Sequence, residues 1–146
     1  MTGTQDIKPI TVLSKKAAKE FESEGLWACI SVCCPDDSFA NVSRVKQLDL
    51  LQLRFWDRDF ARVSDDPEFV FNEGHAKEVW DFVEKNWDKI DELMVHCLMG
   101  QSRSAGIAAA ISKVKYGSDQ SYFEAFTPNM LIYRKLLDEA NSRGLI

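Results

Sequence analysis

Four short segments of the chain are apolar enough to form strands of one sheet. They are Ile10–Leu13, Trp27–Cys33, Leu48–Phe55 and Leu93–Cys97. The second and fourth, WACISVC and LMVHC, are mostly apolar rather than apolar at alternate positions, which is typical of strands buried on both faces. We expect loops in the polar segments, from Ser38 to Lys46 and from Trp56 to Phe71.

Helical patterns alternate with these strands, and residues that cap or open helices introduce them. One clear case is the apolar stripe of Ala76, Val79, Trp80 and Val83, which repeats at helical spacing. The alternation predicts an α/β fold, in which helices flank a central, mostly parallel sheet of four to five strands. The expected helices run from Ser14 to about Glu24 with Gly25 as the stop, from Asn72, from near Arg103 to Gly117, and from Pro128, with short turns at 122–126.

Length and composition agree with one globular domain over residues 1–146. The chain is 45% hydrophobic and 28% charged, which excludes a disordered or collagen-like protein. Its net charge is −5, whereas binding to nucleic acid needs a basic face. We therefore expect no nucleic-acid partner.

The four cysteines and two histidines are too few and too unevenly spaced for a disulfide scaffold or a zinc site. We expect no metal and no cofactor. No apolar run is long enough to span a membrane, and MTGTQDIKPI does not have the pattern of a secretory signal. These observations predict a cytoplasmic domain with reduced thiols and no membrane partner.

One segment carries a pattern of chemical groups. VHCLMGQSRSAG, residues 95–106, puts Cys97 at the end of a buried strand and Arg103 at the start of a helix. The N–H groups of such a loop and of the helix N-terminus attract anions, and Gly100 allows a tight turn. Arg103 offers a planar fork for two phosphate oxygens. The same field would stabilise a thiolate at Cys97.

HCLMGQSRS resembles the HCxxGxxRS signature of the cysteine-dependent protein phosphatases, specifically their dual-specificity branch. The resemblance implies a protein tyrosine phosphatase-like fold and a single catalytic domain. It implies that Cys97 forms a phosphocysteine intermediate and that Arg103 binds the phosphoryl oxygens. Ser104 would donate a hydrogen bond to the sulfur and ease its departure in the second step.

The resemblance also implies a backbone cradle for the phosphate, with His96 holding the loop rather than acting as a base. Gln101 and Ser102 have no assigned side-chain role, since their backbone amides matter more. The residues of this expected cradle are Leu98, Met99, Gly100, Gln101, Ser102 and Arg103.

The family further uses an aspartate on an upstream loop as the general acid. In LQLRFWDRD, Asp57 follows the strand end most directly, and Asp59 comes next. The spacing from Asp57 to Cys97 is longer than usual in the family, and Asp65 and Asp66 fit it better. The disagreement disappears if VSDDPEFVFN is an insertion. We expect Asp57 to be the acid, with the other three as alternatives.

Two further segments resemble parts of the family. FTPNMLIYRKLL is similar to its final helix, which makes Asn129 a candidate support for the phosphate-binding loop, although a plain helix opening needs no function. In some relatives a cysteine near Cys33-Cys34 forms a reversible disulfide with the nucleophile. Successive strand residues point to opposite faces, so only one of the two can face Cys97. The alternative is that both are buried small residues.

The resemblance implies a phosphorylated protein or a small phosphomonoester as substrate. The loop contains no lysine, which disfavours phosphoinositides, and phosphotyrosine and phosphoserine or phosphothreonine both stay open. Three alternatives are a catalytically weak pseudophosphatase, an RNA 5′-triphosphatase, which the acidic charge disfavours, and a thiol enzyme that handles sulfur or arsenate.

Overall fold

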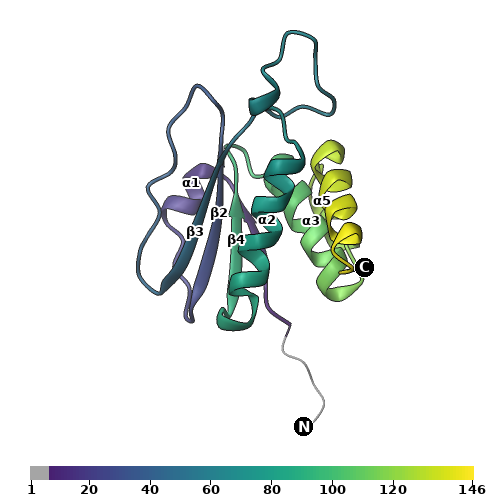
Figure 1. The fold of residues 1–146 in the computed structure, drawn as a ribbon. Helices are drawn as coiled ribbons and strands as arrows, with labels where there is room; N and C mark the ends of the chain where they lie inside the picture. The colour runs from purple at the N-terminus through teal and green to yellow at the C-terminus, as the bar shows by residue number, and fades with distance from the viewer. Residues whose placement is uncertain (1–6) are drawn as a thin grey trace.

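The computed structural model describes residues 7–146, so part of MTGTQDIKPI, where we expect no secretory signal, lies outside it. One sheet of four strands forms its centre (Figure 1). All strand pairings are parallel, in the order β1-β4-β2-β3. The α/β fold with a parallel sheet is thereby confirmed. The strands are β1 (Ile10–Leu13), β2 (Trp27–Cys33), β3 (Gln47–Arg54) and β4 (Glu92–His96).

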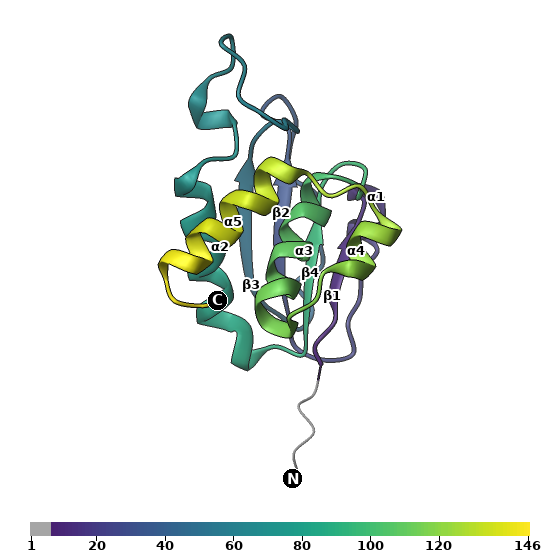
Figure 2. The ribbon, with the colours of Figure 1, turned by 90° about the vertical axis from the view of Figure 1, so that its right-hand side faces the viewer.

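Helices cover the two faces of the sheet unequally (Figures 1 and 2). The longer helices lie on one face, while the short α1 lies on the other. Within residues 7–146, no helix combines the length and the apolar character that crossing a membrane requires. The helices are α1 (Lys15–Lys19), α2 (Glu73–Asn86), α3 (Arg103–Tyr116), α4 (Gln120–Ala125) and α5 (Met130–Ser142), with short 3₁₀ turns at Pro67–Phe69 and Trp87–Lys89.

Two apolar clusters hold the sheet between these layers. The smaller cluster includes Cys29 and Met94, and the larger one includes Ile30 and Val95. Neighbouring residues of β2 and β4 thus belong to different clusters, because successive side chains of a strand point to opposite faces. This two-sided burial explains why both strands are apolar almost throughout.

The first helix is shorter than the expected Ser14–Glu24 segment. Ser14 does cap it, since its hydroxyl accepts the Ala17 N–H. The helix then ends early, because the N–H groups of Glu20 and Phe21 bond only three residues back. The Phe21 ring instead packs edge-on against Trp27, with 4.8 Å between centroids. This contact with the sheet outweighs the local helical pattern.

The parallel strands bring several loops to one edge of the sheet. The segments that follow β2, β3 and β4 all leave at the upper edge in Figure 1. Helix α3 begins at this edge and packs on β1, β4, α4 and α5, so it is buried on almost every side. Gly106 lets α5 approach, because a Cβ there would lie 2.8 Å from the Asn129 carbonyl oxygen.

Candidate active site

The connection from β4 to α3, residues 97–102, is called here the β4–α3 loop. Gly100 takes a φ of 69°, and a Cβ at this position would lie 2.6 Å from the Leu13 carbonyl carbon. The loop therefore lies directly on the end of β1. Two backbone bonds fix it there: Cys97 N–H donates to Leu13 O at 3.4 Å, and Lys15 N–H donates to Leu98 O at 3.0 Å.

The Cys97 thiol lies at the base of this loop. Its residue is only 2% exposed. The Gly100 N–H donates to Sγ at 3.3 Å, and the Ser104 hydroxyl lies 3.0 Å from the same sulfur. These two contacts hold the sulfur between the loop and the first turn of α3.

Cys29 is buried as well, but it lies in a different environment. Cys29 lies in the interior, where its thiol faces the Met94 sulfur at 3.9 Å. Burial raises the pKa of Cys29 to about 12. A thiol in that position stays protonated and unreactive.

Arg103 opens α3 and is 5% exposed. Its Nη1 donates to Phe55 O at 3.0 Å and to the Cys34 sulfur at 3.3 Å. These contacts fix the guanidinium beside the ends of β2 and β3. An arginine has five N–H donors, so the group keeps capacity for an anion on the loop.

His96 supports the β4–α3 loop from behind. Its Nε2 lies 2.7 Å from the Ser31 hydroxyl, and its Nδ1 lies 3.3 Å from Cys97 O. Since a carbonyl only accepts, Nδ1 carries the proton and Nε2 accepts the Ser31 hydroxyl hydrogen. Burial lowers the pKa of His96, which favours the neutral ring, and its two contacts join β2 to the β4–α3 loop.

The segment between β3 and α2, residues 56–71, is called here the β3–α2 loop, and it projects beyond the upper edge of the sheet (Figure 1). It carries Asp57, whose Oδ1 accepts the Ser102 hydroxyl at 2.8 Å and Asn129 Nδ2 at 2.7 Å. Asn129 Nδ2 also donates to Arg58 O at 2.9 Å. The carboxylate is thus tied to the β4–α3 loop and to the start of α5.

Asn129 serves three parts of the site. Its Oδ1 accepts the Ile132 N–H at 3.0 Å and so caps α5, and its own N–H donates to Ser102 O at 3.0 Å. Its side-chain donors reach Asp57 and Arg58. Asn129 therefore contacts the β4–α3 loop, whose support the sequence predicts, through its backbone N–H. Its side-chain amide binds the β3–α2 loop instead.

The other three aspartates have different surroundings. Asp65 accepts the Arg62 N–H at 2.8 Å and pairs with Arg58 Nε at 3.3 Å, and these donors lower the pKa of Asp65. Asp66 caps the 3₁₀ turn by accepting the Glu68 N–H at 3.0 Å. Asp59 is exposed. Of the four candidates, Asp57 is the one bonded to the β4–α3 loop.

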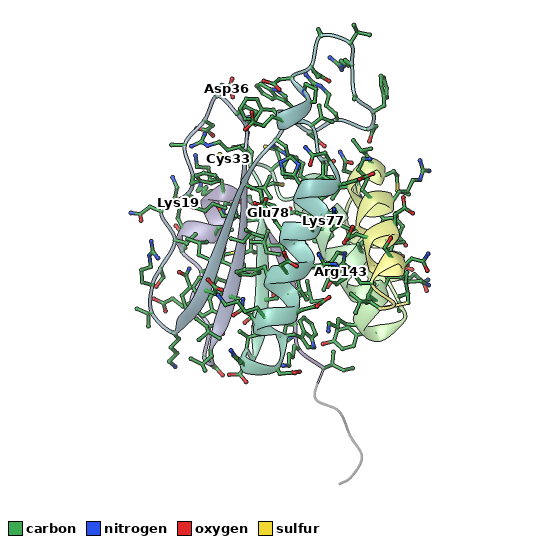
Figure 3. The ribbon with its side chains drawn as sticks, viewed as in Figure 1. Lys19, Cys33, Asp36, Lys77, Glu78 and Arg143 are labelled. Carbon is green, nitrogen blue, oxygen red and sulfur yellow. The ribbon has the colours of Figure 1, made fainter. Side chains whose placement is uncertain are left out.

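The two cysteines at the end of β2 have separate environments. Cys33, marked in Figure 3, directs its thiol to the carbonyl oxygens of Cys34 at 3.3 Å and Asp37 at 3.7 Å. Burial is the main cause that raises the pKa of Cys33. Cys34 directs its sulfur to Arg103. All four cysteines are free. The disulfide with Cys97 stays a prediction. Of the two cysteines, Cys34 is the one whose sulfur contacts a candidate site residue, Arg103.

Three contributors were missed from the sequence. The sequence indicates no role for the Ser102 side chain, but its hydroxyl donates to Asp57. The Lys15 N–H donates to Leu98 O and so holds the β4–α3 loop. Ser31, the partner of His96, could have been noticed in the sequence, because it is the one hydroxyl residue in the apolar strand WACISVC. The first two depend on contacts between distant segments.

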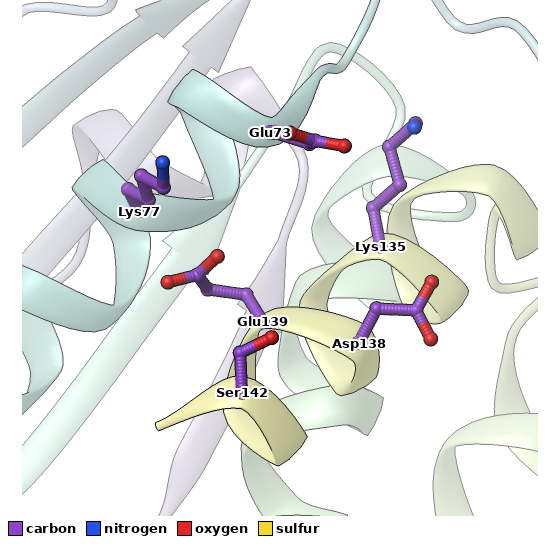
Figure 4. A pocket seen from close by; sticks show the side chains of 6 residues that line it. All are labelled: Glu73, Lys77, Lys135, Asp138, Glu139 and Ser142. Atoms are coloured by element: carbon purple, nitrogen blue, oxygen red, sulfur yellow. The ribbon is translucent and has the colours of Figure 1, made fainter.

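A separate hollow of about 360 Å³ lies between α2 and α5 (Figure 4). Glu73, Asp138 and Glu139 line it with Lys77 and Lys135. Three carboxylates make it unsuited to a phosphate, since like charges repel. It shares no residue with the loops around Cys97.

No protein-family model matches the chain, and no curated protein matches it in sequence. Solved structures do resemble it. Human DUSP28 has a TM-score of 0.62 and 16% identity, covering 92% of this chain and 93% of that chain. The Orf virus protein OH1, described as a tyrosine phosphatase with triple substrate specificity, has a TM-score of 0.54 and 13% identity, covering 93% and 84%.

A third similar structure is a human protein described as a tyrosine phosphatase-like serine/threonine/tyrosine-interacting protein. It has a TM-score of 0.57 and 17% identity, covering 84% of this chain and 80% of that chain. The chain has the fold of the dual-specificity phosphatases.

Proposed function

We propose that the chain is a cysteine-dependent phosphomonoesterase that acts on phosphorylated proteins. One observation carries the proposal: the Cys97 sulfur receives the Gly100 N–H and lies 3.0 Å from Ser104 Oγ, while Ser102 of the same loop holds Asp57. This arrangement supports Cys97 as the nucleophile, the β4–α3 loop as the anion cradle and Asp57 as the proton donor.

In the first step the Cys97 thiolate attacks phosphorus. The P–S bond forms as the bond from phosphorus to the ester oxygen breaks, and protonated Asp57 gives its proton to that oxygen. Both bonds to Asp57 reach Oδ1, so within residues 7–146 Oδ2 has no hydrogen-bond partner and is free to carry the proton. Arg103 and the loop N–H groups bind the phosphoryl oxygens.

In the second step water attacks the phosphocysteine. The Asp57 carboxylate takes a proton from this water, the P–S bond breaks, and inorganic phosphate leaves. Ser104 donates a hydrogen bond to the departing Cys97 sulfur, which lowers the cost of the charge that develops there. The contact of 3.0 Å between Ser104 Oγ and Cys97 Sγ supports this task.

Exposed apolar side chains favour a protein substrate over a free polyanion. Leu98 and Met99, on the β4–α3 loop itself, are 43% and 71% exposed. They suit contact with a phosphotyrosine ring or neighbouring peptide side chains. The net charge of −5 gives a highly charged anion no long-range attraction.

Hydrolysis of 4-nitrophenyl phosphate tests the proposal across about pH 5–8. The rate is expected to rise as the thiol ionises. With alkyl phosphates, whose leaving group needs a proton from the acid, the rate is also expected to fall again at higher pH. Cys97→Ser abolishes turnover, whereas the matched control Cys33→Ser retains it, because the Cys33 thiol faces Asp37 O. Turnover that survives Cys97→Ser would refute the mechanism.

A binding assay covers the alternative of a pseudophosphatase, because one similar structure is described as phosphatase-like and interacting. Wild-type protein that binds a phosphotyrosine peptide tightly, but hydrolyses neither this peptide nor 4-nitrophenyl phosphate, would replace the enzyme proposal with a binding function.

A further inference from the structure

We propose that an apolar pocket between the β3–α2 loop and the start of α5 binds an apolar side chain of the phosphoprotein substrate, within a few residues of the phosphorylated one. This inference rests on the proposed function. It adds a specificity site to the phosphatase reaction.

The pocket has a volume of about 340 Å³. Its walls are mainly apolar, and they include Phe60, Pro67, Val70, Phe71 and Leu131. The volume lies at the lower end of the usual range for ligand sites, roughly 300–1,000 Å³. It therefore suits one aliphatic or aromatic side chain better than an extended ligand.

The charges beside the pocket favour a neutral occupant. Asp59 and Lys135 both line it, and their opposite signs cancel at a distance. The neighbouring hollow in Figure 4, which Lys135 also lines, has three carboxylates instead. Of these two hollows, the pocket lined by Phe60 and Leu131 is the one with mainly apolar walls.

The walls of the pocket are fixed relative to the candidate active site. Asp59 follows Asp57 by two residues and Leu131 follows Asn129 by two, while the Asn129 side chain bonds Asp57 at 2.7 Å. Two residues of chain span at most about 7 Å. A substrate in extended conformation advances about 3.3 Å per residue, so a side chain one to about three residues from the phosphate reaches the pocket.

Phe60 is the residue through which this surface can be tested. It is 67% exposed, so its truncation removes little packing from the folded protein. An exposed aromatic side chain on the wall of an apolar pocket is typical of a surface that gains contacts on binding. Val63, in the same loop, is 108% exposed and does not line the pocket, which makes Val63→Ala a matched control.

The experiment compares phosphotyrosine peptides that carry leucine or serine at each position up to about three residues from the phosphotyrosine. With the wild-type protein, leucine at one position is expected to raise kcat/KM by about tenfold over serine. Phe60→Ala and Leu131→Ala should each remove most of this preference, mainly through KM. Val63→Ala should keep it.

Hydrolysis of 4-nitrophenyl phosphate distinguishes a failure of the pocket from a failure of the proposed phosphatase reaction, because this substrate has no side chain to place in the pocket. Phe60→Ala is expected to leave its kcat/KM unchanged. Turnover of 4-nitrophenyl phosphate with no leucine preference, or with a preference that survives both pocket variants, overturns the inference alone. Absence of all turnover in the wild-type protein overturns the proposed function, and the inference with it.

Discussion

The two loops that meet at the candidate active site are held in different ways. The β4–α3 loop is fixed by backbone bonds to β1 and α1 and encloses the buried Cys97 thiol. The β3–α2 loop is largely exposed. Its link to the β4–α3 loop and α5 runs through the hydrogen bonds that Asp57 receives from Ser102 and Asn129, and through the bond from Asn129 to Arg58 O. One loop is part of the folded core, and the other is tied to it by side chains.

This difference separates two tasks of the proposed reaction. Groups that bind the phosphoryl oxygens have to be in place for every substrate, and rigid backbone suits that task. The acid matters most for poor leaving groups, since good ones depart without a proton. Substitutions in the two loops should therefore differ in how strongly their effect depends on the leaving group.

The largest effect is expected from Arg103→Lys. Lysine keeps the charge but loses the planar fork, so kcat/KM should fall by about 10³-fold. The loss should be similar for aryl and alkyl phosphates, because both present the same phosphoryl oxygens. Steady-state kinetics on the two substrates checks this, with circular dichroism as control for folding. A loss confined to alkyl phosphates would contradict the account.

Asp57→Asn should have the second largest effect. With alkyl phosphates kcat/KM is expected to fall by about 10²-fold, and with 4-nitrophenyl phosphate by much less. The alkaline limb of the pH profile should flatten. Asp59→Asn is the matched control, since Asp59 is exposed as Asp57 is but lacks the bonds that hold Asp57. If Asp59→Asn shows these losses and Asp57→Asn does not, the acid is misassigned.

Asn129→Ser should reduce turnover of alkyl phosphates by about tenfold, the effect of one lost hydrogen bond to a charged group. Serine is a good N-cap and keeps α5 capped, but it cannot donate to Asp57 and Arg58 as Nδ2 does. The readout is the dependence of the rate on the leaving group, which a general loss of stability would not alter. Equal losses on aryl and alkyl phosphates would count against a positioning role.

The smallest expected effect is a change of the free energy of unfolding with pH. Burial lowers the pKa of His96, behind the β4–α3 loop, and of His75, whose ring accepts the N–H of Asn72, the N-cap of α2. Below the ordinary value of 6.5 the unfolded chain takes up protons that the folded chain does not. The free energy of unfolding should therefore fall as the pH drops below about 6.5.

Urea unfolding at about pH 7.5 and pH 5.5 measures this change. His75→Gln keeps a side-chain acceptor for the Asn72 N–H and removes one of the two titrations, so it should reduce the pH dependence in part. A free energy of unfolding that is higher at about pH 5.5 than at about pH 7.5 would contradict this prediction.

Local sequence was sufficient to predict the β4–α3 loop and its context. The buried strand, Gly100, Arg103 and the helix that follows are neighbours along the chain, and each depends on short-range chemistry. The structure has the predicted strand and helix on either side of the loop.

The remaining parts of the site depend on contacts between distant segments. Ser102 and Asn129 meet Asp57 only because three loops share one edge of the sheet. That Cys34 faces Arg103, while Cys33 faces Asp37, likewise required the structure. The sequence left Asp57, Asp59, Asp65 and Asp66 open, because periodicity does not indicate the direction of an aspartate on an irregular loop.

The central claim is that Cys97 carries the phosphoryl group, and a rapid-quench experiment on Ser104→Ala tests it most directly. Loss of the hydrogen bond to the sulfur should slow the second step more than the first, so the phosphocysteine should accumulate. Mass spectrometry of the acid-quenched protein is expected to find one phosphate on the peptide that contains Cys97, and none in Cys97→Ser. Turnover without any adduct on Cys97, or with the phosphate on another residue, would contradict the account.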